Sequence, residues 1–409
     1  MHQSLALPIQ SRKPYVKYTK RHSVAFAVLL AWIIYAISIA YVKILLHVLD
    51  DDMTSYYYRV VPILLILLFE FYHLLKDLDF GKQRFNLIVV YILFIAFQYM
   101  LIRSGLERVI NLIAILISFY VFKKYPLNSN EIVLLYYLFA LVVLLIILNG
   151  TTANNSKDNT KFNSNICAIC LMMLFCLCIA IFAHRKKIGY FVIASICVAL
   201  QFYFTSRNAL LGCALFFISF ILLRAWKRKC KAKTAYMVIL LLSLIGVAAT
   251  YVYSTVLFEL IGKGNVIVFG KDLFTGRQTI WAMTFELIKD NLWFGVGSHV
   301  NETAISATGN EVYRNVHNMP LSILASFGVI NFTLFYLLLP YIIAGGNVFH
   351  KTRVKTVSMT HIVFMSVITI MNYFEAMFFN NWSVPMLIIT YGLIYNCQFL
   401  KKRKKISLL

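Results

Sequence analysis

Long apolar runs alternate with short polar segments along most of this sequence. Spanning the hydrocarbon core of a membrane takes about 20 apolar residues in a helix, so a run of that length predicts a transmembrane helix. The pattern predicts an all-α polytopic membrane protein with about twelve transmembrane helices. The tenth run is long enough to tilt or to break at Pro340. The predicted helices cover residues 24–46, 56–75, 86–102, 108–122, 131–148, 164–183, 188–205, 208–223, 235–258, 317–346, 358–378 and 382–399.

One segment departs from this alternation. Residues 259–316 mix polar and apolar positions, which predicts a single large loop between the ninth and tenth helices. Within this loop, residues 277–289 carry apolar side chains at helical spacing and predict an amphipathic helix lying on the membrane face. The chain therefore divides into an N-terminal tail (1–23), nine helices (24–258), the loop (259–316), three helices (317–399) and a basic C-terminal tail (400–409).

The composition supports a membrane protein and excludes several other classes. The chain is 61% hydrophobic and only 13% charged, which is too few charges to cover a cytosolic enzyme, a DNA-binding domain or a disordered chain. Its eight cysteines show no disulfide or metal pattern, because Cys167-x-x-Cys170 has no second pair at ligand spacing and no nearby histidine. We expect the cysteines to be small packing residues.

The basic residues set the orientation of the chain. With the N-terminus in the cytoplasm and alternation at each helix, 27 of the 39 lysines and arginines fall on the cytoplasmic side. This satisfies the positive-inside rule, places both termini in the cytoplasm and makes 259–316 an extracytoplasmic loop. The net charge of +23 is explained by this orientation, with the lipid bilayer as the partner, and needs no nucleic acid.

Three residues of the outer side are candidates for chemistry. Arg207 lies between two apolar runs, where a guanidinium either snorkels to the interface or contacts an anion such as phosphate. Arg277 begins the predicted loop helix, whose N-terminus favours anions, although an exposed loop charge is the simpler reading. His317 opens the tenth helix, where an imidazole can take a proton from a hydroxyl or serve as a polar anchor. Glu70 and Glu375 either line the same cavity or pair with a cation between helices.

Five short blocks follow one another in a fixed order. They are Thr205-Ser206-Arg207, Thr275-Gly276-Arg277 with Trp281, Trp293-Phe294-Gly295-Val296-Gly297, His317-Asn318 and Leu324-Ala325-Ser326-Phe327-Gly328-Val329-Ile330. Together they resemble the O-antigen polymerase and ligase superfamily, whose members are polytopic inner-membrane proteins with one large outer loop late in the chain. The resemblance is detailed over residues 165–345 and extends to the whole hydropathy profile. Asn208 is a minor departure, because relatives often have glycine there.

The resemblance implies a reaction and a set of roles. A saccharide on undecaprenyl diphosphate would be bound at the outer face of a bacterial cytoplasmic membrane and transferred to an acceptor hydroxyl. Arg207 and Arg277 would hold the diphosphate, and His317 would orient or deprotonate the acceptor. The side chains expected to contact the substrate are Arg207, Arg277, Arg314, Trp281 and Asn318. Because the outer side has no Asp-x-Asp motif, we predict neither a metal nor another cofactor.

Three functions remain open at this point. A polymerase of capsule, exopolysaccharide or O-antigen, acting with a flippase and a chain-length regulator, is preferred. An O-antigen ligase fits the same blocks, since nothing in them separates the two activities. A transporter of lipid-linked sugar is the third reading, but such proteins usually have two similar halves, whereas here the large loop lies in only one half.

The predicted orientation can be tested by labelling. A cysteine introduced at Ser298, in the large loop, should react with a membrane-impermeant thiol reagent in intact cells. Labelling that appears only after lysis would place the loop in the cytoplasm and overturn the assignment of sides.

Overall fold

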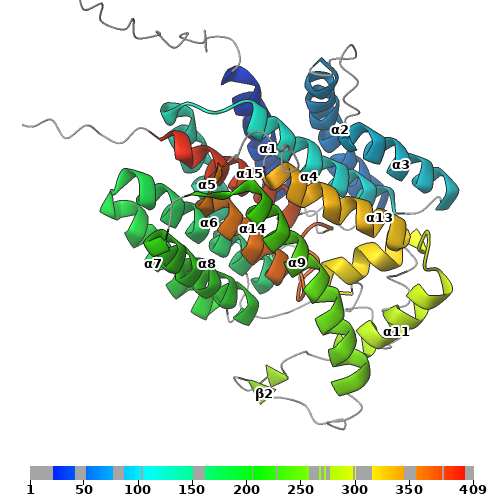
Figure 1. Cartoon of the computed structure of the whole chain (residues 1–409). Helices are drawn as coiled ribbons and strands as arrows, with labels where there is room; N and C mark the ends of the chain where they lie inside the picture. The colour runs from blue at the N-terminus through cyan, green and yellow to red at the C-terminus, as the bar shows by residue number, and fades with distance from the viewer. Residues whose placement is uncertain are drawn as a thin grey trace, which may run out of the picture.

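The chain folds almost entirely into helices (Figure 1). This computed structural model describes residues 22–41, 52–76, 87–102, 105–150, 162–204, 206–226, 229–257, 267–268, 271–272, 277–297, 300, 316–344, 356–379 and 382–400. The helices are α1 (His22–Tyr41), α2 (Asp52–Lys76), α3 (Leu87–Ile102), α4 (Leu106–Lys124), α5 (Ser129–Leu148), α6 (Ser164–Arg185), α7 (Ile188–Tyr203), α8 (Arg207–Trp226), α9 (Ala232–Tyr251), α11 (Arg277–Asp290), α13 (Met319–Ala344), α14 (Met359–Met371) and α15 (Ser383–Asn396). A π-helical turn, Val252–Leu257, prolongs α9, and a 3-10 turn, Cys397–Phe399, follows α15.

Every predicted apolar run coincides with a helix, from α1 to α9 and then α13, α14 and α15. By length and composition, five of the described helices can cross a membrane, and four shorter ones are also apolar. The prediction of an all-α membrane protein is therefore confirmed in outline, while the number of crossings stays a prediction. The helices are apolar on their outer faces too: Leu93 and Met100 of α3, for example, are 66% and 72% exposed. Lipid is the medium in which such surfaces are stable.

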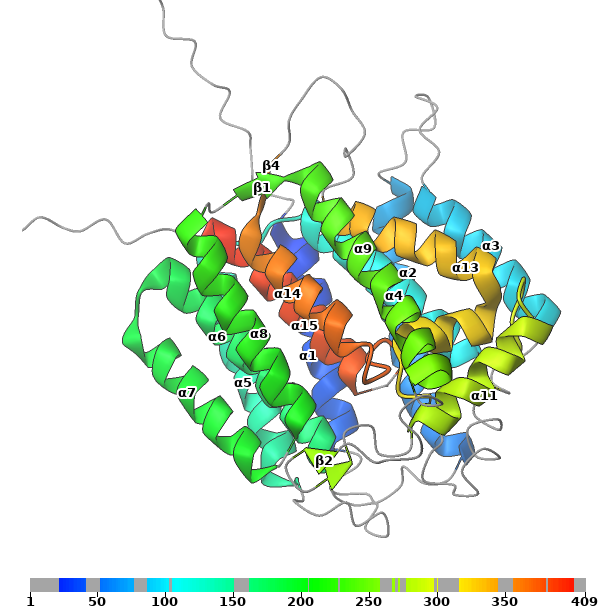
Figure 2. The same cartoon turned by 60° about the horizontal axis from the view of Figure 1, so that its bottom comes forward.

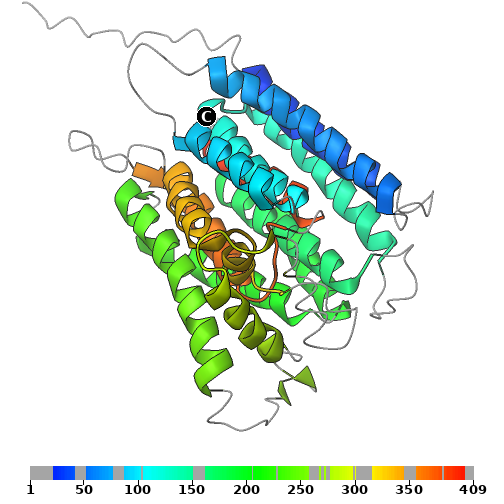
Figure 3. The ribbon, with the colours of Figure 1, turned by 90° about the vertical axis from the view of Figure 1, so that its right-hand side faces the viewer.

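The helices run side by side, and segments distant in sequence are neighbours (Figure 3). In Figure 2, α1, α14 and α15 occupy the middle of the bundle, with α5 to α8 on one side and α2, α3, α4, α9 and α13 on the other. The core is continuous through all of these helices and includes six of the eight cysteines in α6, α7 and α8. All eight cysteines are free thiols, and Cys167 and Cys170 are buried.

Two small antiparallel sheets interrupt the helical pattern. Strand β1 (Lys229–Lys231) pairs with β4 (Thr356–Ser358), and β2 (Ile267–Val268) pairs with β3 (Lys271–Asp272). Because β1 joins α8 to α9 and β4 leads into α14, the β1–β4 pair marks one end of the bundle (Figure 2). The opposite end, where α8 and α13 begin and α9 and α14 end, is called the site end below.

Helix α13 breaks near its middle, at Gly328 rather than at Pro340. Gly328 has φ 71° and ψ 178°, a backbone conformation that is essentially restricted to glycine, whereas Pro340 lies within helical backbone. The break arises because residues 292–297, which follow α11, cross α13 at this point. The Val296 N–H donates to Ala325 O over 2.9 Å and the Val329 N–H donates to Leu292 O over 2.8 Å.

Glycines make this crossing possible. A Cβ atom on Gly328 would lie 2.2 Å from Trp293 O, and one on Gly295 would lie 2.5 Å from Phe327 N. Gly295 also has a positive φ of 71°. The side chain of Gln98, on α3, donates to Phe294 O over 2.7 Å and to Phe327 O over 2.6 Å, which satisfies carbonyls that the break leaves without helical partners. The Trp-Phe-Gly-x-Gly block and the Phe-Gly block are therefore the two sides of one contact.

Helix α14 ends at Met371, seven residues before the predicted end at 378. The connection to α15 is a compact loop that packs against α13 and α9. The Met319 N–H donates to Asn372 O over 2.7 Å, and the Tyr373 hydroxyl donates to Leu242 O of α9. A Cβ atom on Gly246 would meet the Tyr373 ring, so α9 has no room there for a larger residue. This loop carries Glu375 to the site end.

The crossing of residues 292–297 with α13 predicts an effect of single methyl groups. Gly328→Ala should lower the free energy of unfolding by at least about 1–3 kcal/mol, because it adds backbone strain and a clash with Trp293 O. Gly189→Ala is the matched control, since nothing lies within 4 Å of the added methyl. Thermal unfolding of the purified protein in detergent measures both, and equal midpoints would contradict the crossing.

Candidate active site

Glu375 joins two of the predicted site residues at the site end. One carboxylate oxygen, Oε1, lies 3.1 Å from Nη2 of Arg277, and the other, Oε2, lies 3.2 Å from Nδ1 of His317. Arg277 also donates from Nη1 to Phe374 O over 2.5 Å. The Arg277 and Glu375 side chains are each 14% exposed and that of His317 is 25% exposed, so the cluster is shielded but reachable from solvent.

Glu375 is charged because of its two partners. Burial alone would raise the pKa of the Glu375 carboxyl, but the hydrogen bond with His317 and the charge of Arg277 outweigh burial and lower the pKa from its ordinary 4.5 to about 2. The carboxylate fixes Nδ1 of His317 as the nitrogen that faces Glu375. The ring nitrogen suited to act on a substrate hydroxyl is then Nε2.

His317 lies in a left-handed backbone conformation with φ 51°, which is uncommon for a residue other than glycine. Tertiary contacts on both sides hold this conformation in place. The Trp281 indole N–H, from α11, donates to Val316 O over 2.8 Å. Asn318 caps α13, because its Oδ1 accepts from the Leu321 N–H at 2.9 Å, while its Nδ2 donates to Thr250 Oγ1 and Tyr373 O at 2.9 and 3.0 Å.

Trp281 and Asn318 were predicted to contact the substrate, and that role stays a prediction. Both side chains are buried, at 2% and 0% exposure, and their polar atoms bond within the protein. These bonds hold the backbone on either side of His317. Helix α11 itself forms as predicted, but its apolar face packs against protein and not against a membrane surface. The face consists of Ile280, Trp281, Phe285 and Ile288. It forms one hydrophobic cluster with Val300, Val316, Leu321 and Ala325.

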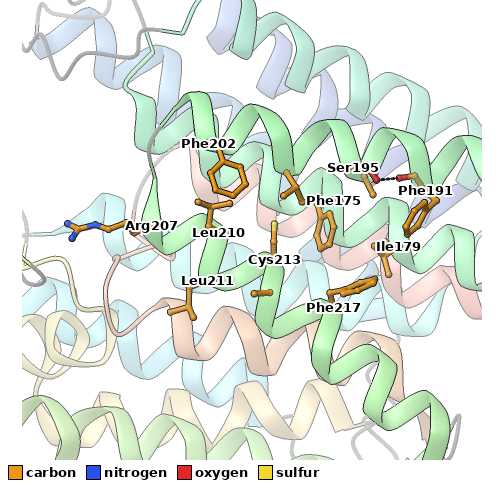
Figure 4. A pocket seen from close by; sticks show the side chains of 13 residues that line it. Phe175, Ile179, Phe191, Ser195, Phe202, Arg207, Leu210, Leu211, Cys213 and Phe217 are labelled. Atoms are coloured by element: carbon orange, nitrogen blue, oxygen red, sulfur yellow. Dashed lines mark hydrogen bonds between the residues drawn. The ribbon is translucent and has the colours of Figure 1, made fainter. Parts of the chain in front are cut away.

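Arg207 lies elsewhere at the site end, as the first residue of α8. It borders an apolar groove of about 950 Å³ between α6, α7 and α8, with Phe175, Phe202 and Phe217 among the lining residues. Figure 4 shows the guanidinium at one end of the groove, directed away from the apolar side chains. Part of the groove wall is exposed, since Phe202 of α7 is 66% exposed. A cation therefore lies at one end of a partly exposed apolar groove.

Sequence reasoning missed a further arginine, Arg108, in the first turn of α4. Its Nη1 donates to Ser326 Oγ of α13 and lies 3.4 Å from Gly297 O, and its guanidinium lies 5.2 Å from the centre of the Phe379 ring. The signal available in the sequence was a charge inside an apolar run. Arg108 is the first residue of the fourth predicted run, 108–122, which is the shortest of the twelve.

The remaining candidates lie outside this cluster. Arg314 is outside the described residues, as are Thr275 and Gly276. Glu70 is fully buried between α1, α2 and α4, where the Ser118 hydroxyl and the Trp32 indole donate to its carboxyl at 2.8 and 3.5 Å. It therefore does not line the site. Among the described residues, no group of three or more His, Cys, Asp or Glu side chains is placed to hold a metal ion.

The Glu375 cluster predicts a pH-dependent stability. Glu375→Ala leaves the Arg277 charge without its partner and should lower the free energy of unfolding by about 3 kcal/mol at pH 7. Since the folded-state pKa is depressed, the stabilisation is complete above pH 4.5 and is lost as the pH falls through about 2. Denaturant unfolding of both proteins across this range should show the difference shrinking; a constant difference would contradict the ion pair.

Comparison with known proteins covers the segment that holds most of these groups. Residues 189–336 match the family model described as O-antigen ligase. No curated protein matches the chain. The matched segment includes Arg207, Arg277, His317 and both glycines of the crossing, whereas Arg108 and Glu375 lie outside it. The match confirms, over residues 189–336, the similarity to the O-antigen polymerase and ligase superfamily that the sequence blocks indicate.

Proposed function

We propose that this protein is a membrane glycosyltransferase that polymerises a polysaccharide. It transfers a saccharide from undecaprenyl diphosphate to a hydroxyl of another lipid-linked repeat unit, and its site end faces the outside of a bacterial cytoplasmic membrane. The domain match supports a substrate of this class. The product is a capsule, an exopolysaccharide or an O-antigen, and the reaction uses no metal.

The observation that carries this proposal is Arg207 at the mouth of the apolar groove. A lipid-linked sugar has a long apolar chain and an anionic head, and the groove offers apolar surface ending at a fixed cation. The volume of about 950 Å³ is at the upper end of the range of about 300–1,000 Å³ for ligand pockets. A soluble sugar donor would have no use for such a groove. The guanidinium also suits a diphosphate, which it can bind through two parallel hydrogen bonds.

The reaction needs charge stabilisation at the leaving group. The acceptor oxygen forms a bond to the anomeric carbon while the bond from that carbon to the phosphate oxygen breaks, so both bonding electrons leave with the lipid diphosphate. Arg207 and Arg277 stabilise this developing charge in place of a metal ion. Arg277 is already fixed by Phe374 and Glu375, so little reorganisation is required when the substrate binds.

His317 accepts the proton that the acceptor hydroxyl loses. With Nδ1 held against Glu375, Nε2 receives the proton and the resulting imidazolium is stabilised by the carboxylate at 3.2 Å. Trp281 and Asn318 act indirectly, by holding the backbone on either side of His317. Glu375 positions the histidine and balances the charge of Arg277, so it is a positioning residue and not one that contacts substrate.

A second candidate function is that of a ligase, which transfers the finished polysaccharide to a different acceptor. It is favoured by the description of the matching family model, O-antigen ligase. The donor site and the chemistry would be the same in both cases. Only the acceptor differs, so an assay that supplies lipid-linked repeat units alone separates the two functions.

The roles of the arginines can be tested by substitution. Arg207→Ala and Arg277→Ala should each abolish polymer formation by purified protein supplied with lipid-linked repeat units, and Arg→Lys should restore little, because an ammonium cannot form the forked contact. Arg185→Ala is the matched control: this arginine ends α6 away from the site end and contacts Ser129. Full activity of both lysine variants would show that charge alone suffices.

The histidine should behave differently from the arginines. His317→Ala should stop chain extension and leave binding of undecaprenyl diphosphate nearly unchanged, whereas Arg277→Ala should weaken that binding. The same assay in EDTA should proceed at the normal rate. Loss of activity on chelation, restored by magnesium or manganese, would overturn the metal-free mechanism, and a fully active His317→Ala protein would remove His317 from it.

A further inference from the structure

Arg108 marks a second place where a cation meets lipid-facing apolar surface. It lies on α4, whereas the first such place, at Arg207, lies between α6, α7 and α8. The Arg108 guanidinium contacts Gly297 O and Ser326 Oγ. It therefore lies against both segments of the crossing, residues 292–297 and helix α13. A partly buried cation at this position is costly to maintain in an apolar protein unless it interacts with an anion or a strong dipole.

The apolar surface beside Arg108 is formed by α3 and the crossing segment. The hydrogen bond from Gln98 to Phe294 O places the second half of α3, residues 95–102, directly against this segment. This half is called the outer half of α3 below. Trp293 and Phe294 are 62% and 48% exposed, and Phe97 and Met100 of α3 are 58% and 72% exposed. From Trp293 to Gly297, where Arg108 binds, the chain advances four residues, which is at most about 14 Å. A lipid chain on the aromatic surface can therefore carry a phosphate that reaches Arg108.

The same helix connects Arg108 with the reacting groups. Ser326, which accepts from Arg108, lies nine residues after His317 along α13. Nine residues of helix rise by about 14 Å, so the Arg108 contact is set back from His317 by roughly that distance. This spacing suits the acceptor substrate, the lipid-linked saccharide whose hydroxyl attacks. The hydroxyl that attacks is at the far end of the saccharide from its own lipid diphosphate, so that diphosphate must bind at a distance from the proton acceptor.

We infer that the surface formed by Arg108, Trp293, Phe294 and the outer half of α3 binds the acceptor, a second lipid carrying a diphosphate-linked saccharide. This inference rests on the proposed function, because of the two activities only the polymerase uses two saccharides that are both linked to undecaprenyl diphosphate. The donor occupies the groove at Arg207 and the acceptor occupies the surface at Arg108. The saccharide of the acceptor spans the distance from Arg108 to His317.

Counting bound lipids tests this assignment without measuring activity. The full-length protein, purified in detergent, is incubated with undecaprenyl diphosphate and the bound molecules are counted by native mass spectrometry. Wild type should bind two. Arg207→Gln and Arg108→Gln should each weaken one of the two binding events by at least about tenfold, the size expected for loss of one charged hydrogen-bonding partner. The double variant should lose both.

Two further variants separate binding from folding. Arg108 also supports the crossing, so Arg108→Gln is accompanied by Trp293→Ala, which removes an exposed ring and should weaken only the second binding event. Leu134→Ala is the control, because Leu134 is 51% exposed in the first half of α5, toward the end of the bundle opposite the site end. In a two-substrate assay, Trp293→Ala should raise the KM for the acceptor and leave the KM for the donor unchanged.

The outcomes distinguish this inference from the proposed function. A single bound lipid that is lost in Arg207→Gln and retained in both Arg108→Gln and Trp293→Ala would overturn the acceptor surface and leave the donor site intact. Failure of wild type to bind any undecaprenyl diphosphate would overturn both. If an anionic phospholipid competes equally well for the second event, the surface is a general lipid contact and the inference is wrong.

Discussion

The Glu375 carboxylate holds the site together, because it is the common partner of groups from three separate parts of the chain. Arg277 begins α11, His317 precedes α13, and Glu375 lies between α14 and α15. Without the carboxylate, the Arg277 charge would lie in a shielded space without its counter-ion, which is strongly destabilising. The ion pair and the hydrogen bond instead fix the imidazole orientation and bring α11 onto the bundle. The catalytic geometry proposed above depends on this one bridging interaction.

The crossing at Gly295 and Gly328 joins two distant backbone segments, just as Glu375 joins distant side chains. It interrupts α13 so that its first half can take a separate direction while the chain after α11 passes directly over it. Irregular backbone at this depth of a membrane protein is tolerated only when protein partners satisfy its polar groups. Here Gln98, whose own Oε1 accepts from Asn331, supplies those partners. The buried amide network is therefore a condition for the shape of the site.

The sequence predicted the helices well, because each is encoded locally by an apolar run. The sequence predicted that the tenth helix would either tilt or break at Pro340, and α13 breaks at Gly328. The cause of this break is a segment more than thirty residues earlier in the chain, and no local pattern reports such a crossing. Arg207, Arg277 and His317 were found from their neighbours in sequence. The bridge through Glu375 could not be found in that way, because its partners are 98 and 58 residues distant. The contacts of Arg108 could not be found either, because its partners Gly297 and Ser326 are 189 and 218 residues distant.

The start of α13 has an electrostatic consequence. A helix N-terminus carries a partial positive charge, and α13 begins at Met319, two residues after His317, so this charge is close to the reacting groups. Its hydrogen-bond donors, however, are already used: the Met319 N–H donates to Asn372 O, the Leu321 N–H to Asn318 Oδ1 and the Ser322 N–H to Asn318 O, while Pro320 has none. The helix can therefore contribute a field to an anion but no direct contact. At this helix end, direct hydrogen bonds to a phosphate must therefore come from side chains, a role that the proposed arginines can fill.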